Sequence, residues 1–184
     1  MASLREAALL KKVVVSWLRE KVAASGMSGG IVGLSGGIDS AVVAALLRVA
    51  FGDAMLAVML PCHSDPQDEC DARLVAGTLG LPLAKVDLSG TYDALVGALG
   101  AENSLSSLAL ANVKPRLRMI SLYALARDRR LLVCGTGNKD EWTVGYFTKH
   151  GDSGADLLPL GDLVKGEVRA LAAHLGVPQR VIDK

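Results

Sequence analysis

The sequence predicts an α/β fold in which a parallel sheet carries helices on both faces. Four short apolar runs, bounded by glycine, proline or polar turns, alternate with longer segments of helical composition. Hydrophobic residues make up 51% of the 184 residues and charged residues 21%, which is enough apolar material for a buried core. Strands that alternate with helices are joined by right-handed crossovers and therefore run in parallel. We expect residues 1–184 to form a single domain.

The first predicted element is an amphipathic helix at residues 4–24. Leu10, Val14 and Leu18 recur at helical spacing on one face, and the helix stops in a glycine-containing turn. Glycine bounds the first strand on both sides, and Pro61 ends the second. This first half of the chain is expected to contain strands at residues 30–34 and 54–60 and a helix at residues 39–50. A polar stretch at residues 63–68 is expected to lead into a second helix that ends at Gly80.

The second half of the chain continues the alternation less regularly. Residues 89–111 are expected to form a looser segment before the next helix. Pro115 is placed in the first turn of that helix, where an amide N–H has no intrahelical partner. Gly176 and Pro178 end the last helix. The strands are expected at residues 82–88 and 131–134 and the helices at residues 112–126 and 165–175.

Composition excludes several classes of function. A net charge of +1 provides no broad positive field, so we expect no binding to nucleic acid or to a membrane surface. The three cysteines have no paired spacing, which indicates a reducing compartment and no disulfide framework. No apolar run reaches the length of a membrane span, and charged residues interrupt the first apolar stretch. We expect a cytoplasmic protein.

The clearest chemical motif is Gly33-Leu-Ser-Gly-Gly-Ile-Asp-Ser40, at a predicted junction of strand and helix. Its glycines allow close approach of backbone amides, and the helix N-terminus adds partial positive charge, so the loop suits a pyrophosphate. It lacks the lysine of a Walker A loop, and Asp39 fits a phosphate site when a divalent cation bridges the two. The alternative is a glycine turn capped by Asp39 or Ser40.

This loop resembles the SGGxDS pyrophosphate loop of the N-type ATP pyrophosphatases. Further segments resemble, in order and spacing, the motifs of one member family, the NAD synthetases. They begin at Asn112 (Asn-Val-Lys-Pro-Arg-Leu-Arg-Met), Gly135 (Gly-Thr-Gly-Asn-Lys-Asp-Glu), Gly145 (Gly-Tyr-Phe-Thr-Lys-His-Gly-Asp) and Asp156 (Asp-Leu-Leu-Pro-Leu-Gly-Asp-Leu-Val-Lys). The resemblance spans nearly the whole chain and implies a Rossmann-like fold of the ATP pyrophosphatase type.

The resemblance also implies residue roles. Asp39 and Glu141 would bind magnesium, for which carboxylate oxygens are suited ligands. Deamido-NAD would bind at Arg116, Lys149 and Asp156, and the catalytic residues would be Asp39, Lys149 and Lys165. ATP would contact Gly33, Leu34, Ser35, Gly36, Gly37, Ile38, Asp39, Ser40, Met59, Thr136 and Lys165. Met59 stands where some bacterial members carry an arginine, so its contact with adenine is expected to be apolar or through the backbone.

Several of these assignments have simpler alternatives. Glu141 can stabilise a helix N-terminus without binding metal. Arg116 and Arg118 lie about 200° apart on a helix, so one of them is expected to face the ligand, and we favour Arg116. Tyr146 and Phe147 can belong to the core instead of a substrate platform, and Cys134 is expected to be a buried apolar residue.

The activity implied by the resemblance is ATP-dependent amidation of deamido-NAD. An acyl-adenylate would form, AMP and pyrophosphate would be released, and ammonia would come free or from a separate glutaminase. The resemblance also implies a homodimer. The family usually continues beyond the position of Lys184 with a segment that completes the substrate sites, which we expect this chain to lack. The alternatives are another amide-forming or tRNA-modifying ATP pyrophosphatase, and a non-catalytic adenine-nucleotide sensor.

Overall fold

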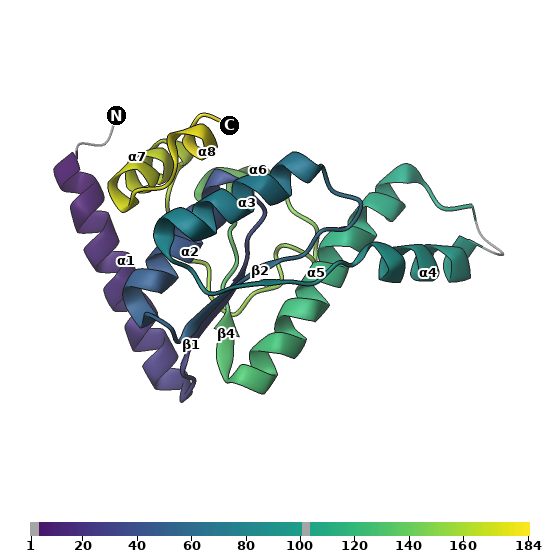
Figure 1. The fold of residues 1–184 in the computed structure, drawn as a ribbon, viewed down its shortest axis with the longest axis horizontal. Coiled ribbons are helices and arrows are strands. Elements are labelled where there is room, and N and C mark those ends of the chain that lie inside the picture. Colours follow the sequence, from purple (N-terminus) through teal and green to yellow (C-terminus); the bar gives the residue numbers. More distant parts are fainter. Residues whose placement is uncertain (1–3, 101–103) are drawn as a thin grey trace.

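A parallel sheet of four strands forms the centre of the computed structural model, which describes residues 4–100 and 104–184 (Figure 1). The strands are β1 (Gly29–Gly33), β2 (Met55–Met59), β3 (Leu83–Lys85) and β4 (Leu131–Val133), and their spatial order is β3-β2-β1-β4. In this register Ile31 of β1 lies between Leu56 of β2 and Val133 of β4. The order changes direction between β1 and β4, which is where ligands of such sheets bind.

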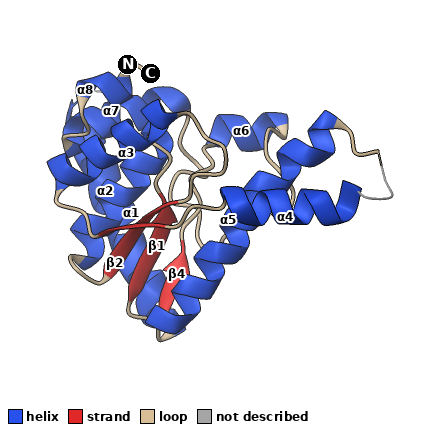
Figure 2. Ribbon diagram, turned by 45° about the vertical axis from the view of Figure 1, so that its right-hand side comes forward, coloured by secondary structure: helices blue, strands red, loops and turns tan. Residues whose placement is uncertain are grey.

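Helices cover both faces of the sheet (Figure 2). One face packs against α1 (Leu4–Ser25), α2 (Ile38–Phe51), α3 (Pro66–Leu79) and α7 (Lys165–Leu175), with the short α8 (Gln179–Ile182) beside α7. The other face packs against α5 (Ser107–Arg129), on which α4 (Ser89–Gly100) lies. A further short helix, α6 (Lys139–Val144), follows β4. The two faces carry separate apolar cores, and the neighbouring residues Val32 and Ile31 of β1 belong to one core each.

The predicted fold class and the order of the strands and main helices are confirmed, with boundaries that differ by a few residues. The expected looser segment 89–111 is wrong, because it contains α4 and the beginning of α5. Ser106 starts α5 by accepting a hydrogen bond from the backbone N–H of Ala109, a side-chain cap that precedes the expected start. Pro115 therefore lies inside α5 and leaves the carbonyl of Ala111 without its usual helical donor.

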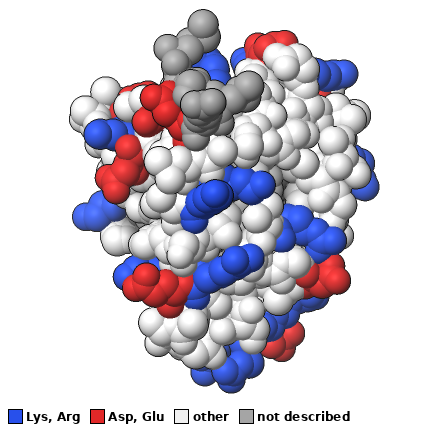
Figure 3. All heavy atoms as spheres, turned by 90° about the vertical axis from the view of Figure 1, so that its left-hand side faces the viewer, with Lys and Arg blue, Asp and Glu red and all other residues white. Residues whose placement is uncertain are grey.

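The N-terminal helix is tied to its neighbour as well as packed on it. Arg19 of α1 donates hydrogen bonds to the carbonyls of Val49 and Ala50, near the end of α2. The face that carries α1 shows Lys and Arg interspersed with Asp and Glu among uncharged atoms (Figure 3). Within residues 4–100 and 104–184, no helix combines the length and the apolarity that crossing a bilayer requires.

Candidate functional site

A cavity of about 530 Å³ opens beyond the carboxyl ends of β1, β2 and β4. Its floor comes from the ends of these strands, and its walls come from the start of α3, the middle of α5 and the segment 151–154. Five of the residues predicted to bind ATP line it: Gly33, Leu34, Ser35, Met59 and Thr136. The volume falls in the range of cavities that hold small-molecule ligands.

The predicted phosphate loop borders this cavity and is held in shape by its own hydroxyls. Ser40 Oγ accepts a hydrogen bond from the Ser35 N–H at 3.2 Å and donates to the Gly37 carbonyl at 2.9 Å. The two serine hydroxyls lie 3.0 Å apart. The cap residue of α2 is Gly37, with no side-chain capping bond, so the interpretation of Asp39 or Ser40 as a mere helix cap is wrong. The first-turn N–H groups of α2 remain for an anion.

Gly36 is the point at which the loop meets α3. Its φ is +81°, which favours glycine. A Cβ there would lie 2.4 Å from the Asp68 carbonyl oxygen and 3.1 Å from Asp71 Cβ, both in α3. The loop therefore runs directly against the backbone of α3, and only a residue without a side chain fits.

On the other side of the loop, Asp39 belongs to a polar cluster formed by three separate segments. The ammonium group of Lys165, the first residue of α7, pairs with Asp39 Oδ2. The amide of Asn138 donates to Asp39 Oδ1 at 3.1 Å. Asn138 also exchanges hydrogen bonds with Glu141, its N–H donating to Glu141 Oε2 at 3.0 Å and its Oδ1 accepting from the Glu141 N–H at 3.1 Å. One asparagine thus joins the two carboxylates predicted to bind metal.

The donor set of this cluster fits magnesium. In the part of the chain that the structure describes, no group of three or more His, Cys, Asp or Glu side chains gathers as a metal site. Magnesium, however, keeps several waters and binds proteins through one or two carboxylates together with substrate phosphates. Asp39 and Glu141 supply two such carboxylates around Asn138, next to the phosphate loop. Glu141 caps α6 as well, so the simpler interpretation of this residue also describes a real contact.

The two arginines of α5 separate as predicted, but their roles differ from the expectation. Arg118 lines the cavity and donates to the Leu60 carbonyl at 3.0 Å and to Ser64 Oγ at 3.3 Å. Arg116 lies outside the cavity lining, and its Nε and Nη2 donate to the backbone carbonyl of Lys149 at 3.3 and 3.2 Å. Arg118, not the favoured Arg116, thus faces this cavity, and binding of deamido-NAD by Arg116 and Lys149 stays a prediction.

Asp156, the third residue predicted to bind deamido-NAD, connects β4 to α5. Its Oδ2 accepts from the Val133 N–H at 2.8 Å and its Oδ1 from the Tyr123 hydroxyl at 3.0 Å. Burial, this hydrogen bond and the charge of Asp156 raise the pKa of Tyr123 to about 12. Burial, with a smaller effect of Asp156, also raises the pKa of the Cys134 thiol to about 12, and Cys134 is buried as expected.

The residues around α6 are more exposed than a core requires. Phe147 packs on Trp142 with ring centroids 4.5 Å apart, and Tyr146 is 78% exposed. The interpretation of Tyr146 as a core residue is therefore wrong. Three buried polar side chains stand out among the described residues, Ser40, Asp71 and Asn138, and each lies in the phosphate loop or against it.

Comparison with known proteins decides the family. The sequence model of the NAD synthase family matches residues 10–184. The chain belongs to the NAD synthase family. It is 50% identical over 173 residues to the NH(3)-dependent NAD(+) synthetase of Carboxydothermus hydrogenoformans, covering 93% of this chain and 71% of the relative. The corresponding enzyme of Finegoldia magna is 46% identical over 171 residues, covering 93% of this chain and 70% of the relative.

Solved structures of similar proteins share the whole fold of this NAD synthase family member. An NH3-dependent NAD synthetase from Campylobacter jejuni superposes with a TM-score of 0.90 at 33% identity, covering 97% of this chain and 77% of its own. An NMN synthetase from Francisella tularensis superposes with a TM-score of 0.92 at 36% identity, covering 100% of this chain and 75% of its own.

Sequence reasoning did not single out three residues that the structure places at the site. The sequence favours Arg116 over Arg118, and the position of Asp71 depends on packing between segments that are distant in sequence. Asn138 had a readable signal, because Asn138-Lys-Asp-Glu141 has the spacing of a capping box before a helix. Gly36, Gly37, Ile38, Asp39, Ser40, Glu141 and Lys165 lie beside the cavity instead of lining it.

Proposed function

We propose that this protein converts deamido-NAD to NAD, using ATP and ammonia and releasing AMP and pyrophosphate. The observation that carries the proposal is the phosphate loop, which lacks a lysine of its own and is flanked by the cluster of Asp39, Asn138, Glu141 and Lys165. A sensor of nucleotides needs neither the paired carboxylates nor the lysine. Family membership joins this arrangement to ammonia-dependent NAD synthesis.

The reaction consists of two displacements. An oxygen of the nicotinate carboxylate attacks the α-phosphorus of ATP, pyrophosphate leaves, and an acyl-adenylate forms. Ammonia then attacks the carbonyl carbon, a proton is lost, and AMP leaves with one of the former carboxylate oxygens. Adenylation is needed because a free carboxylate has no acceptable leaving group. The protein contributes by holding the reactants together and by stabilising charge on phosphorus.

The residues of the phosphate loop and its cluster divide this work. The N–H groups at the start of α2 bind the β- and γ-phosphates, and Met59 and Thr136 lie in the cavity, where the adenosine binds. Asp39 and Glu141 would hold a magnesium ion, which would supply positive charge to neutralise the phosphates. Lys165 places a second positive charge at the loop. Arg116, Lys149 and Asp156 bind deamido-NAD, with Lys149 on an exposed segment that Arg116 holds in place.

We also propose that two copies form a homodimer through α4 and α5. None of the 12 residues of α4 is buried, and Ala126 is the one buried residue of the 23 in α5. Leu108 and Ile120 are 70% and 58% exposed, which is costly for a face left in water. Light scattering of the wild-type protein at micromolar concentration tests this directly, and a monomer would contradict it. Ile120→Asp should dissociate the dimer, whereas Leu9→Asp on α1, where Leu9 is 62% exposed, should not.

The proposal also covers the nitrogen source, the compartment and the domain organisation. Ammonia is supplied free or by a separate glutaminase. The three free cysteines fit a reducing cytoplasm. The whole chain acts as one domain.

One neighbour supports a second candidate substrate. The NMN synthetase from Francisella tularensis shares the fold of the entire chain, and the mononucleotide analogue of deamido-NAD carries the same nicotinate carboxylate. We favour deamido-NAD because the curated relatives at 50% and 46% identity are named NAD synthetases, whereas that neighbour is 36% identical.

A substrate comparison tests the proposal. The protein is incubated with ATP, a magnesium salt, ammonium and either deamido-NAD or nicotinic acid mononucleotide, and NAD, NMN, AMP and ADP are separated by chromatography. We expect NAD and AMP in equal amounts, and a higher kcat/KM for the dinucleotide. A higher kcat/KM for the mononucleotide would show that the mononucleotide is the preferred substrate. ADP as the nucleotide product would contradict cleavage between the α- and β-phosphates.

A further inference from the structure

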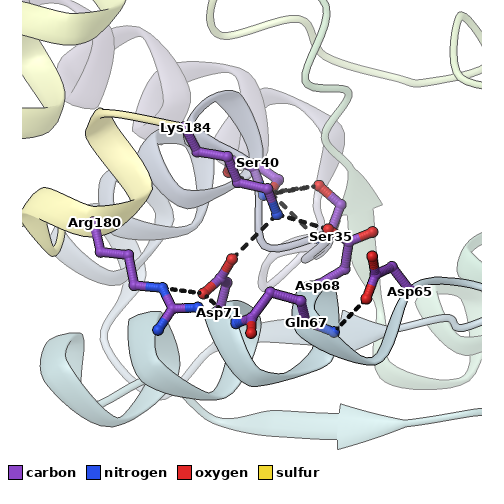
Figure 4. A network of polar contacts seen from close by, with 9 residues as sticks. Ser35, Ser40, Asp65, Gln67, Asp68, Asp71, Arg180 and Lys184 are labelled. Carbon is purple, nitrogen blue, oxygen red and sulfur yellow. Dashed lines mark hydrogen bonds and ion pairs between the residues drawn. The ribbon is translucent and has the colours of Figure 1, made fainter.

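A buried carboxylate on α3 ties the C-terminal end of the chain to the phosphate loop (Figure 4). The side chain of Asp71 is 3% exposed. Its Oδ1 accepts from Arg180 Nε and Gln67 Nε2, each at 3.0 Å, and its Oδ2 accepts from Lys184 Nζ at 3.1 Å. Lys184 also pairs with Asp68 Oδ1 at 2.6 Å. Arg180 belongs to α8 and Lys184 follows it, so two cations from one segment meet on α3.

The same turn of α3 lies directly against the loop at Gly36. The Asp68 carbonyl oxygen and Asp71 Cβ are the atoms that a Cβ at Gly36 would meet, at 2.4 and 3.1 Å. The position of α3 therefore sets how far Gly36 and the neighbouring amides can move. Any shift of α3 away from the loop opens space beneath Gly36, and any shift toward it creates a clash with backbone atoms.

Asp71 stays ionised in its buried position because of its hydrogen-bond and ion-pair partners. Burial by itself opposes ionisation, but the hydrogen bonds from Lys184 and Gln67 and the charges of Arg180 and Lys184 outweigh it and hold the pKa of Asp71 below its ordinary value. A buried carboxylate is costly unless it is paired and hydrogen-bonded, so Asp71 is stable only in the position where these donors reach it. Val181, which is fully buried, packs α8 into the apolar core.

The same C-terminal segment also touches the loop from its other flank. It begins at Lys165, which pairs with Asp39 at the start of α2, and it ends with Arg180 and Lys184 on Asp71. Residues 165–184 thus contact the loop itself at Asp39 and the helix beside it at Asp71.

We propose that Asp71 is a positioning residue for ATP, which holds α3 and the C-terminal segment in one arrangement and so keeps the loop around Gly36 in its phosphate-binding shape. This inference rests on the proposed function, because it assigns ATP to the loop. Asp71 acts through the position of α3 and not by contact with ATP. Loss of the network should weaken ATP binding, leave binding of deamido-NAD unchanged and leave the chemical step nearly unchanged.

The test uses variants that differ in their connection to the loop. Arg180→Gln removes one cation from Asp71 at a side chain that is 60% exposed, so the fold should survive. Arg73→Gln is the matched control, since Arg73 also forms an ion pair on α3, with Glu69, but does not contact Asp71. Asp71→Asn removes the charge itself, and Arg180→Lys restores the cation. For each variant we measure KM for ATP and for deamido-NAD, kcat, the melting temperature, and calorimetric binding of α,β-methylene-ATP.

We expect KM for ATP to rise about threefold in Arg180→Gln and about tenfold in Asp71→Asn, the range of coupling through packed networks. Arg180→Lys should return close to wild type, Arg73→Gln should match wild type, and KM for deamido-NAD should not move. The double variant Asp71→Asn/Arg180→Gln should equal Asp71→Asn, because both changes act through one carboxylate. If Asp71→Asn fails to fold, Arg180→Gln and its control decide.

Two results separate the failure of this inference from the failure of the proposed function. A wild-type protein that makes NAD, with the same KM for ATP in Arg180→Gln as in Arg73→Gln, overturns the inference alone. A wild-type protein that binds no α,β-methylene-ATP and makes no NAD overturns the proposed function and the inference with it. A lower melting temperature in Arg180→Gln with unchanged ATP binding would show a purely structural role and also overturn the inference.

Discussion

Substitution of Gly36 by alanine is the sharpest structural test of how the loop is built. Alanine at a φ of +81° costs about 1–2 kcal/mol for the left-handed conformation alone. Its Cβ would also lie 2.4 Å from the carbonyl oxygen of Asp68, and a backbone atom cannot rotate out of the way as a side chain can. Forcing α3 and the loop apart should add about 1–3 kcal/mol, the usual cost of overpacking.

Two other glycines separate the two contributions. Gly26 has a φ of +69° and nothing within 4 Å of an added Cβ, so Gly26→Ala measures the conformational cost alone, about 1–2 kcal/mol. Gly37 has a φ of −92°, and its added Cβ would meet only Ser35 Oγ at 3.4 Å, so Gly37→Ala should change stability by less than about 0.5 kcal/mol.

The assay is urea unfolding followed by circular dichroism, which gives the free energy of unfolding of each variant. Gly36→Ala should lose about 2–5 kcal/mol in total, or about 4–20 °C in melting temperature for a chain of this size. Refutation would be a Gly36→Ala protein that is no less stable than Gly26→Ala. That result would mean that α3 does not rest on the loop.

Three further predictions concern single charged or titrating groups. Asp39→Asn should lower kcat by about 10²-fold with little change in melting temperature, because it removes one of the two carboxylates that would hold magnesium at the phosphates, and activity within about threefold of wild type would contradict this. Tyr123 should ionise with a pKa of about 12 in an ultraviolet titration, and Tyr123→Phe should abolish that transition. Because this pKa is raised, the stabilising contribution of Tyr123 is present below pH about 10 and is lost as pH rises toward 12. Asp71 has a lowered pKa, so its contribution is present above its ordinary pKa of about 3.9 and is lost as pH falls through the folded value; a free energy of unfolding that drops as steeply in acid for Asp71→Asn as for wild type would contradict this.

The sequence predicted the fold class because local patterns and the fold agree in this chain. Short apolar runs bounded by glycine, such as residues 30–34, are typical of buried central strands, and the helices between them carry clear stops such as Gly80 and Gly176. The prediction of a looser segment at residues 89–111 was wrong because the helices there have little apolar periodicity. No residue of α4 is buried within one copy of the chain, so its sequence lacks the apolar face by which a helix is recognised.

The candidate site divides in the same way between local and distant information. The phosphate loop and the capping box at Asn138 are contiguous motifs and can be read directly. The contact of Asp71 with the loop joins residues that are 35 positions apart, and its pairing with Arg180 joins residues 109 apart. Which of Arg116 and Arg118 faces the cavity depends on how α5 is rotated about its axis. That rotation is set by packing against the sheet and cannot be read from the sequence of the helix.

Transfer of oxygen from substrate to AMP tests the central claim most directly. Deamido-NAD is prepared with a heavy oxygen isotope in its nicotinate carboxylate and is converted with ATP, magnesium and ammonium, and the AMP is analysed by mass spectrometry. Attack of the carboxylate on the α-phosphorus predicts that each AMP formed carries one heavy oxygen and that NAD retains the other. Unlabelled AMP, or label in ADP or inorganic phosphate, would contradict an acyl-adenylate and with it this account of the site.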